Sequence, residues 1–362
     1  MIYLLLKSHV SQFHIANLIH YISFRVMISI LFSFGFTSIF GSRMISLLKE
    51  WKNEGQPIRD YIPEAHRAKL GTPTMGGLII IFSVLLSCSL FADMLNPYVN
   101  IAIITLVGFG LIGFVDDYLK ISKKNHTGLS SRQKLLAQVI AALPACIAVS
   151  WLSDPLYSEV LCIPFSKSLM INLGYFYIPF SVFVIIGSSN AVNLTDGLDG
   201  LAIVPICIVS ACFALICYLV GSNIHANYLQ LVHVPGIAEL AVVCGALIGA
   251  GLGFLWFNAQ PAEVFMGDTG SLSMGAFLGV LSIISKHEII LAIAGGIFVI
   301  ETLSVIIQVY YFKATGGERF FKMAPIHHHF EKCGWSESKV VIRFWIISCL
   351  LAIIALSSLK LR

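Results

Sequence analysis

The chain has 362 residues, of which 57% are hydrophobic and only 12% charged, and its mean hydropathy is +0.86. This composition excludes an ordinary soluble enzyme and predicts a polytopic membrane protein, folded as a single all-α domain over residues 1–362. The formal net charge is only +4, which gives no reason to expect a nucleic-acid partner. The nine cysteines form neither a disulfide framework nor a Cys-x-x-Cys metal motif.

Apolar segments long enough to cross a membrane recur along the whole chain. A spanning helix needs roughly 20 mostly apolar residues. About ten such segments are predicted, at 22–41, 76–94, 98–115, 135–152, 176–192, 201–220, 238–257, 270–285, 289–311 and 340–359. The eighth is short and the ninth contains Gly295-Gly296, so nine or eleven spans remain possible. Between the fourth and fifth segments, residues 153–175 predict a small surface hairpin.

Basic residues are concentrated in alternate loops. Most of the 23 Lys and Arg residues follow odd-numbered segments, and basic residues in short loops accumulate on the cytoplasmic side. This asymmetry predicts that both termini lie outside and that the loops after odd-numbered segments are cytoplasmic.

Five polar clusters lie at the ends of every second apolar segment. If each segment crosses the membrane once, all five meet at one face, which we predict to be cytoplasmic. Carboxylates, a lysine and histidines collected there indicate a metal-assisted phosphate site. The clusters are Lys69 with Gly71–Gly77, Asp116-Asp117, Asn193–Gly200, Phe265–Asp268 and His327-His328-His329.

Three carboxylates are candidate catalytic groups. Asp116 and Asp117 end the third segment, where the helix dipole disfavours negative charge. Because neighbouring helical side chains point about 100° apart, we expect one to face the site and the other to be held by a lysine or a backbone group. Asp268 precedes the eighth segment and could be a helix N-cap. Its carboxylate is also the type of ligand that Mg²⁺ prefers, and we predict that it binds this ion.

The stretch from Asn193 to Gly200 has a polar side chain at every third position. If the stretch is helical, Asn193, Asp196 and Asp199 lie along one face. The alternative is a capped turn between two helices, since these residues are common turn formers. A turn explains one aspartate well and two poorly, which favours a functional role for the stretch.

The remaining candidates are cationic, aromatic or imidazole groups. Lys69 and Lys134 would offset the charge of a phosphate substrate, although both also obey the positive-inside rule. Phe265 could stack on a base or simply pack at the interface.

The three consecutive histidines have no cysteine or Glu-x-x-His spacing that would support zinc. Because adjacent side chains diverge, one or two of them are expected to contact phosphate or act as an acid. Glu301 in the ninth segment should face the bundle interior, because facing lipid would cost roughly 2.5–3.5 kcal/mol.

Taken together, these motifs resemble the phospho-N-acetylmuramoyl-pentapeptide transferase family, a branch of the polyprenyl-phosphate N-acetylhexosamine-1-phosphate transferases. The resemblance extends from the first predicted cytoplasmic loop to the last helix, with the motifs in the family's order. The matching stretches are His66–Gly77, Asp116-Asp117, Asn193–Gly200, Phe265–Ser271 and Pro325–Glu331.

The resemblance implies a dimeric, ten-helix, Mg²⁺-dependent enzyme of the bacterial inner membrane. It would transfer phospho-N-acetylmuramoyl-pentapeptide from its UDP carrier to undecaprenyl phosphate, giving UMP and lipid I. The implied catalytic set is Asp116, Asp117, Asp268 and His327, with Asp268 as the metal ligand. Asn193, Asp196 and Phe265 fall where the family contacts uridine, with Lys69 near the same pocket; Lys134, Asp199 and His328 complete the predicted substrate-binding residues.

Two other functions and two chemical routes remain open. A related transferase would take UDP-N-acetylglucosamine, and an ion-coupled transporter would need polar residues near mid-membrane, where only Glu301 qualifies. The lipid phosphate could attack directly, assisted by Asp116 or Asp117, or an aspartyl intermediate could form. Direct attack is favoured because a dianionic phosphate is already a competent nucleophile.

Overall fold

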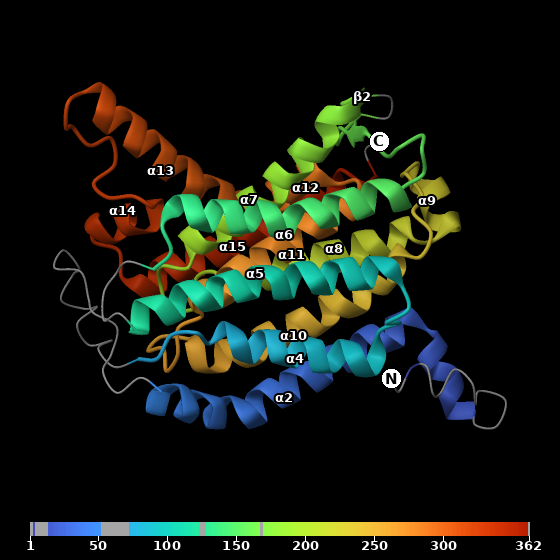
Figure 1. Cartoon of the computed structure of the whole chain (residues 1–362), viewed down its shortest axis with the longest axis horizontal. Helices are drawn as coiled ribbons and strands as arrows, with labels where there is room; N and C mark the ends of the chain where they lie inside the picture. Colours follow the sequence, from blue (N-terminus) through green and yellow to red (C-terminus); the bar gives the residue numbers. More distant parts are fainter. Residues whose placement is uncertain (1–2, 4–13, 52–71, 123–127, 167–168, 361–362) are drawn as a thin grey trace.

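The computed structural model describes residues 3, 14–51, 72–122, 128–166 and 169–360, so Lys69 lies outside the described residues. The chain forms a bundle of long helices (Figure 1). The long helices are α2 (Ile22–Trp51), α4 (Gly77–Phe91), α5 (Pro97–Ser122), α6 (Ser131–Leu152), α7 (Tyr177–Thr195), α8 (Ile203–Val220), α10 (Leu240–Asn258), α11 (Gly267–Ser285), α13 (Gly296–Ala314) and α15 (Glu337–Ser357).

Short elements connect the long helices. The short helical elements are η1 (His14–His20), η2 (Gly174–Phe176), α9 (Asn223–Leu229), η3 (Ile237–Glu239), α12 (Glu288–Ala294) and α14 (Ile326–Lys332). Strands β1 (Val160–Cys162) and β2 (Met170–Asn172) pair antiparallel, with Val160 opposite Asn172. This pair confirms the predicted hairpin between the fourth and fifth apolar segments.

The all-helical, multi-span architecture predicted from hydropathy is confirmed. Each predicted segment corresponds to a helix, and nine helices in the described part of the chain are long and apolar enough to cross a membrane, whereas α4 has only 15 residues. The ninth segment is divided: α12 ends at Ala294 and α13 begins at Gly296. Two consecutive glycines weaken a helix at this point because glycine loses the most backbone entropy on folding.

The third segment continues further than its apolar run predicts. Helix α5 ends at Ser122, so Asp116 and Asp117 lie inside the helix and not at its end. Lys120 lies one turn after Asp116, and its ammonium is 2.6 Å from that carboxylate. Such an i,i+4 pair supports the additional turn, which hydropathy cannot detect.

Helix α11 is the central helix of the bundle. Every residue from Thr269 to Ser285 is buried, and α11 packs along α5 and α7. Glycines allow this approach: a Cβ at Gly275 or Gly279 would lie within 3 Å of the α7 backbone. Small residues at helix contacts are typical of membrane bundles. The packing places the start of α11 beside the ends of α5 and α7, where the polar motifs lie.

Candidate active site

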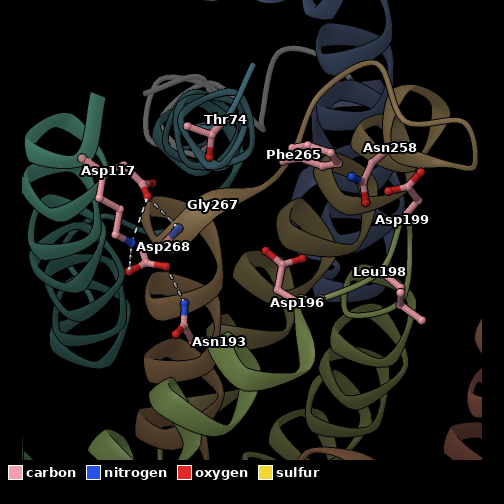
Figure 2. A pocket seen from close by; sticks show the side chains of 12 residues that line it. Thr74, Asp117, Asn193, Asp196, Leu198, Asp199, Asn258, Phe265, Gly267 and Asp268 are labelled. Atoms are coloured by element: carbon pink, nitrogen blue, oxygen red, sulfur yellow. Dashed lines mark hydrogen bonds and ion pairs between the residues drawn. The ribbon is translucent and has the colours of Figure 1, made fainter. Parts of the chain in front are cut away.

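A polar cavity opens where the end of α7, the start of α11 and the last turns of α5 meet (Figure 2). It brings together residues from four of the five predicted clusters, with Thr74 from the Gly71–Gly77 run, and adds Lys120 and Asn258, which the sequence did not single out. The predicted residues that line it are Asp117, Asn193, Asp196, Asp199, Phe265 and Asp268. The convergence of these motifs at one end of the bundle is therefore observed for the described residues.

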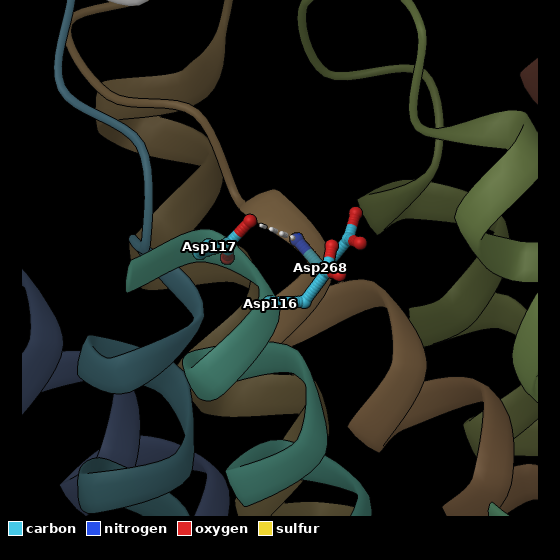
Figure 3. Close-up of side chains that lie close together, drawn as sticks. All are labelled: Asp116, Asp117 and Asp268. Carbon is cyan, nitrogen blue, oxygen red and sulfur yellow. Dashed lines mark hydrogen bonds between the residues drawn. The ribbon is translucent and has the colours of Figure 1, made fainter. Parts of the chain in front are cut away.

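Asp117 is bound to the beginning of α11. Its carboxylate accepts hydrogen bonds from the backbone nitrogens of Thr269 (3.0 Å) and Asp268 (3.3 Å), and from the Thr269 hydroxyl (2.8 Å); Figure 3 shows the bond to Asp268. The first N–H groups of a helix have no partner within it and attract negative charge. Asp117 thus caps the N-terminus of α11, for which no neighbouring residue in the described part of the chain supplies a side-chain cap.

A glycine in α5 makes this contact possible. A Cβ at Gly113 would lie 2.2 Å from the carbonyl oxygen of Asp268, so any larger residue would separate α5 from the start of α11. Gly113 precedes Asp117 by one turn on the same helix face. Close approach at Gly113 therefore sets the distance between Asp117 and the backbone that it caps.

Asp116 is held on the other side of the pair. Its carboxylate accepts a hydrogen bond from the Leu129 backbone nitrogen (2.7 Å) and lies 2.6 Å from the Lys120 ammonium. We expected one of the two aspartates to be held by a lysine or a backbone group and the other to face the site. Both are held, and Asp117 also faces the cavity.

Asp268 lies at the centre of an ionic network. Its Oδ2 is 2.7 Å from the Lys134 ammonium and 3.0 Å from that of Lys120, and its Oδ1 accepts a hydrogen bond from Asn193 (2.8 Å). Helix α11 already begins at Gly267, and the N-cap position belongs to Met266, without a side-chain hydrogen bond. The alternative interpretation of Asp268 as an N-cap is therefore wrong, and the capping carboxylate is Asp117.

The three carboxylates suit a hard divalent cation. Asp116, Asp117 and Asp268 each offer an oxygen, and these oxygens lie within 4.8 Å of one another (Figure 3). Mg²⁺ prefers such oxygen ligands. In the protein alone, the ammonium groups of Lys120 and Lys134 provide the positive charge at Asp268. A cluster of three carboxylates and two lysine ammonium groups can bind a divalent ion together with a phosphate group.

The polar residues of the 193–200 stretch are spread along the cavity. Helix α7 ends at Thr195, so the stretch is not one helix and the three side chains do not share one helical face. Asn193 contacts Asp268, Asp196 lies in the middle of the cavity, and Asp199 lies on the far side (Figure 2). Asp199 accepts a hydrogen bond from the Ala262 backbone nitrogen. Beyond Thr195 the chain forms a turn, which was the alternative interpretation of this stretch.

Asp196 is the cavity carboxylate with the most unusual environment. Burial, together with the negative charges of Asp268 and Asp117, raises the pKa of Asp196 to about 8. A carboxyl group in this position favours a proton, a hydrogen-bond acceptor or a nearby cation. In its neutral form it is suited to a ligand that brings a hydrogen-bond acceptor, and in its ionised form to one that brings positive charge.

The described part of the Gly71–Gly77 motif, from Thr72 onward, supports the cavity through its backbone. Phe265 donates its N–H to the carbonyl of Pro73, Gly76 donates to the carbonyl of Phe265, and Gly77 donates to that of Met266. These bonds fix the short segment that carries Phe265 and leads into Asp268. The segment's position depends on contacts between residues about 190 apart in the chain, which spacing in the sequence cannot reveal.

The three histidines have three different partners. Nδ1 of His327 lies 3.1 Å from Glu301, Nδ1 of His328 lies 2.7 Å from Glu331, and Nδ1 of His329 accepts the Lys322 N–H. Adjacent side chains diverge, as expected. His327 is buried and packs behind the cavity wall at Gly197 instead of lining the cavity.

Lys120 and Asn258 were missed by sequence reasoning. Lys120 is one of the basic residues that follow the third apolar segment, and its i,i+4 spacing from Asp116 is a signal for an ion pair. Asn258 accepts the Gly200 N–H and donates to the Val264 carbonyl, which joins two walls of the cavity. No local pattern marks it, because both partners come from the folded arrangement.

Comparison with known proteins agrees with this site. Residues 99–286 match the model of glycosyl transferase family 4, and residues 69–81 match the phospho-N-acetylmuramoyl-pentapeptide-transferase signature 1. Proteins named phospho-N-acetylmuramoyl-pentapeptide-transferase are 59% identical in Rickettsia felis (strain ATCC VR-1525 / URRWXCal2) and in Rickettsia montanensis, and 58% identical in Rickettsia rickettsii; each match covers 100% of both chains. With full-length identity at this level and the family's motifs around one cavity, the chain belongs to the phospho-N-acetylmuramoyl-pentapeptide-transferase family.

Proposed function

We propose that this chain transfers phospho-N-acetylmuramoyl-pentapeptide from its UDP carrier to undecaprenyl phosphate, releasing UMP and forming lipid I for peptidoglycan synthesis. Family membership supports a transferase of this kind. The observation that carries the proposal is the group formed by Asp116, Asp117 and Asp268 with Lys120 and Lys134. Such a group can bind a diphosphate and stabilise charge that moves onto a leaving phosphate.

The carboxylate group is the proposed Mg²⁺ site. Asp268 would be the principal ligand, with Asp116 and Asp117 beside it. When bound, the ion supplies positive charge that neutralises the donor diphosphate. Lys120 and Lys134 would remain near the phosphates as point charges, because both already lie at the same Asp268 oxygen.

Direct attack by the lipid phosphate is the proposed route. Asp117 is committed to the α11 N-terminus, and Asp116 is bound by Lys120 and the Leu129 backbone. A carboxylate that gives up such bonds in order to attack phosphorus loses the capping interaction, which disfavours an aspartyl intermediate. The residues would therefore position the two phosphates and leave the attack to the lipid phosphate itself.

The uridine end of the donor is proposed to occupy the other part of the cavity. Phe265 offers a ring there, and Asn193, Asp196 and Asp199 offer polar groups (Figure 2). Aromatic stacking and a few placed hydrogen-bonding groups are sufficient to recognise a base. Lys69, outside the described residues, and His328 are proposed as further contacts of the donor.

The proposed location is the bacterial inner membrane, with the cavity on the cytoplasmic face. The nine candidate spans support a membrane protein, and a nucleotide donor made in the cytoplasm requires a site on that side. A homodimer is proposed from the family resemblance. The lipid acceptor would reach the site from the membrane, since the cavity lies at the ends of spanning helices.

UMP release from purified protein tests the proposal. We expect release only when undecaprenyl phosphate and UDP-N-acetylmuramoyl-pentapeptide are both present with Mg²⁺. Equal turnover with UDP-N-acetylglucosamine would assign the chain to the related transferases instead. Absence of UMP under all these conditions, with ion uptake by proteoliposomes, would favour the transporter.

A further inference from the structure

Glu301 and His327 form a buried contact that the proposed reaction does not yet use. Glu301 is fully buried in α13, a helix with only a few buried positions. Its Oε2 lies 3.1 Å from Nδ1 of His327 in α14, which is also buried. The contact has ion-pair distance without hydrogen-bond alignment, and neither Glu301 oxygen has a hydrogen-bond partner among the described residues.

The burial of Glu301 requires a compensating partner. An unpaired carboxylate in apolar surroundings costs several kcal/mol, and the polar group that the structure places against it is the imidazole of His327. A carboxylate at one imidazole nitrogen fixes the ring orientation and keeps the proton on that nitrogen. Glu301 therefore determines which nitrogen of His327 faces the opposite direction.

That opposite nitrogen faces the cavity wall. A Cβ at Gly197 would lie 2.4 Å from Nε2 of His327, so the ring fills the space that the absent side chain leaves. Gly197 itself lines the cavity between Asp196 and Leu198. Nε2 has no hydrogen-bond partner among the described residues. It is thus a buried polar atom directed at a turn that carries substrate-binding candidates.

The neighbouring histidines do not share this arrangement. His328 pairs with Glu331, three residues further along the same short helix. His329 accepts a hydrogen bond from the Lys322 backbone. The His328–Glu331 pair is a matched comparison, because it has the same chemistry in the same segment but local partners.

We propose that Glu301 is a positioning residue that acts through His327. It holds the proton on Nδ1 and turns Nε2 toward Gly197, so that Nε2 is a hydrogen-bond acceptor for a hydroxyl or N–H group of the donor bound against that turn. Only the identity of this ligand rests on the proposed function. The orientation of His327 by Glu301 is independent of it.

A double-mutant cycle tests whether the two residues act as one unit. Purified Glu301→Gln, His327→Asn and the double variant are compared for kcat and KM of UMP release and for Tm. We expect each single change to lower kcat at least tenfold, and the double variant to be no worse than the poorer single variant. In the control, Glu301→Gln combined with Glu331→Gln should show losses that multiply.

Losses that multiply between Glu301→Gln and His327→Asn would overturn the proposal, as would an unchanged kcat in Glu301→Gln. If Glu301→Gln does not fold, Gly197→Ala replaces it, because the added Cβ displaces Nε2; an unchanged kcat in that variant would also overturn the proposal.

A readout without turnover separates this proposal from the proposed function. ¹⁵N NMR of histidine-labelled protein, with the His327 signal assigned from His327→Asn, reports which imidazole nitrogen carries the proton. We expect protonated Nδ1 in the wild type and a shifted ratio in Glu301→Gln. The same spectrum in both proteins would contradict the positioning role, even if UMP release were normal.

Discussion

The carboxylate of Asp117 in α5 accepts hydrogen bonds from both the backbone nitrogen and the hydroxyl of Thr269 in α11, at 3.0 and 2.8 Å. The two residues are separated by more than 150 positions, and together they join the second half of the bundle to the first at the proposed reaction centre. Asp117 therefore has a structural task beside any role in chemistry, and the two can be separated by substitution.

Thr269→Val should isolate the structural task. The change keeps the backbone bond and the side-chain shape but removes the hydroxyl, so it should cost about 1 kcal/mol of stability and leave most of the turnover. Asp117→Ala removes the acceptor for all three bonds and should lower both Tm and kcat. Differential scanning fluorimetry and UMP release measure the two effects. Full activity in Asp117→Ala would mean that Asp117 only caps α11.

Asp268→Asn should affect chemistry far more than stability. The amide keeps the volume and one acceptor oxygen, while Lys120 remains paired with Asp116. Loss of the proposed metal ligand should reduce turnover by at least about 100-fold, of the order seen when a principal electrostatic group is removed. Asp154→Asn, at an exposed site, is the control. Near-normal turnover with an unchanged Mg²⁺ requirement would remove Asp268 from the metal site.

The sequence predicted most of the residues that gather at the cavity, but not how they are held. Alternation of apolar segments is sufficient to place the ends of α5 and α7 and the start of α11 together. The partners of those residues depend on tertiary packing: Asp117 meets Thr269 because Gly113 admits the α11 backbone. A period of three also suggested one helix through Asp199, whereas α7 ends at Thr195. The turn-forming residues after Thr195 have a stronger effect on the backbone than the three-residue spacing of the polar side chains.

Gly113→Ala should damage the site from a distance. A methyl group there would lie 2.2 Å from the Asp268 carbonyl oxygen, and backbone cannot move aside as a flexible side chain does. We expect a loss of about 1–3 kcal/mol, typical of overpacking, together with a lower kcat. Gly108→Ala is the matched control in α5, because its nearest neighbour would be 3.8 Å away. Equal Tm values for the two variants would contradict the close approach.

The end of the bundle that carries α14 is predicted to face the cytoplasm. Native Cys333 is exposed at that end, whereas Tyr175, before α7, is exposed at the other. With Cys349 replaced by alanine, an impermeant maleimide should label Tyr175→Cys in intact spheroplasts and should label Cys333 only after lysis. Labelling of Cys333 from outside would invert the topology and place the cavity away from a cytoplasmic nucleotide.

At the opposite end of the bundle, a buried group of ionisable side chains predicts a pH dependence of stability. The Tyr177 hydroxyl donates a hydrogen bond to Glu288, and the Lys286 ammonium lies 4.1 Å from the centre of the Tyr177 ring. Burial raises the pKa of Glu288 to about 7 and lowers the pKa of Lys286 to about 8.

Between the ordinary pKa of a glutamate and pH 7, the folded chain retains a proton on Glu288 that the unfolded chain releases. The contribution of Glu288 to stability is therefore largest at low pH and is lost as the pH rises to about 7. Lys286 acts in the opposite direction above pH 8, where the unfolded chain holds the extra proton. Glu288→Gln keeps an acceptor for Tyr177 without titrating. The Tm of the wild type should therefore fall relative to that of Glu288→Gln between pH 5 and pH 7, measured in one detergent; parallel curves would show that Glu288 is already ionised in the folded protein at pH 5.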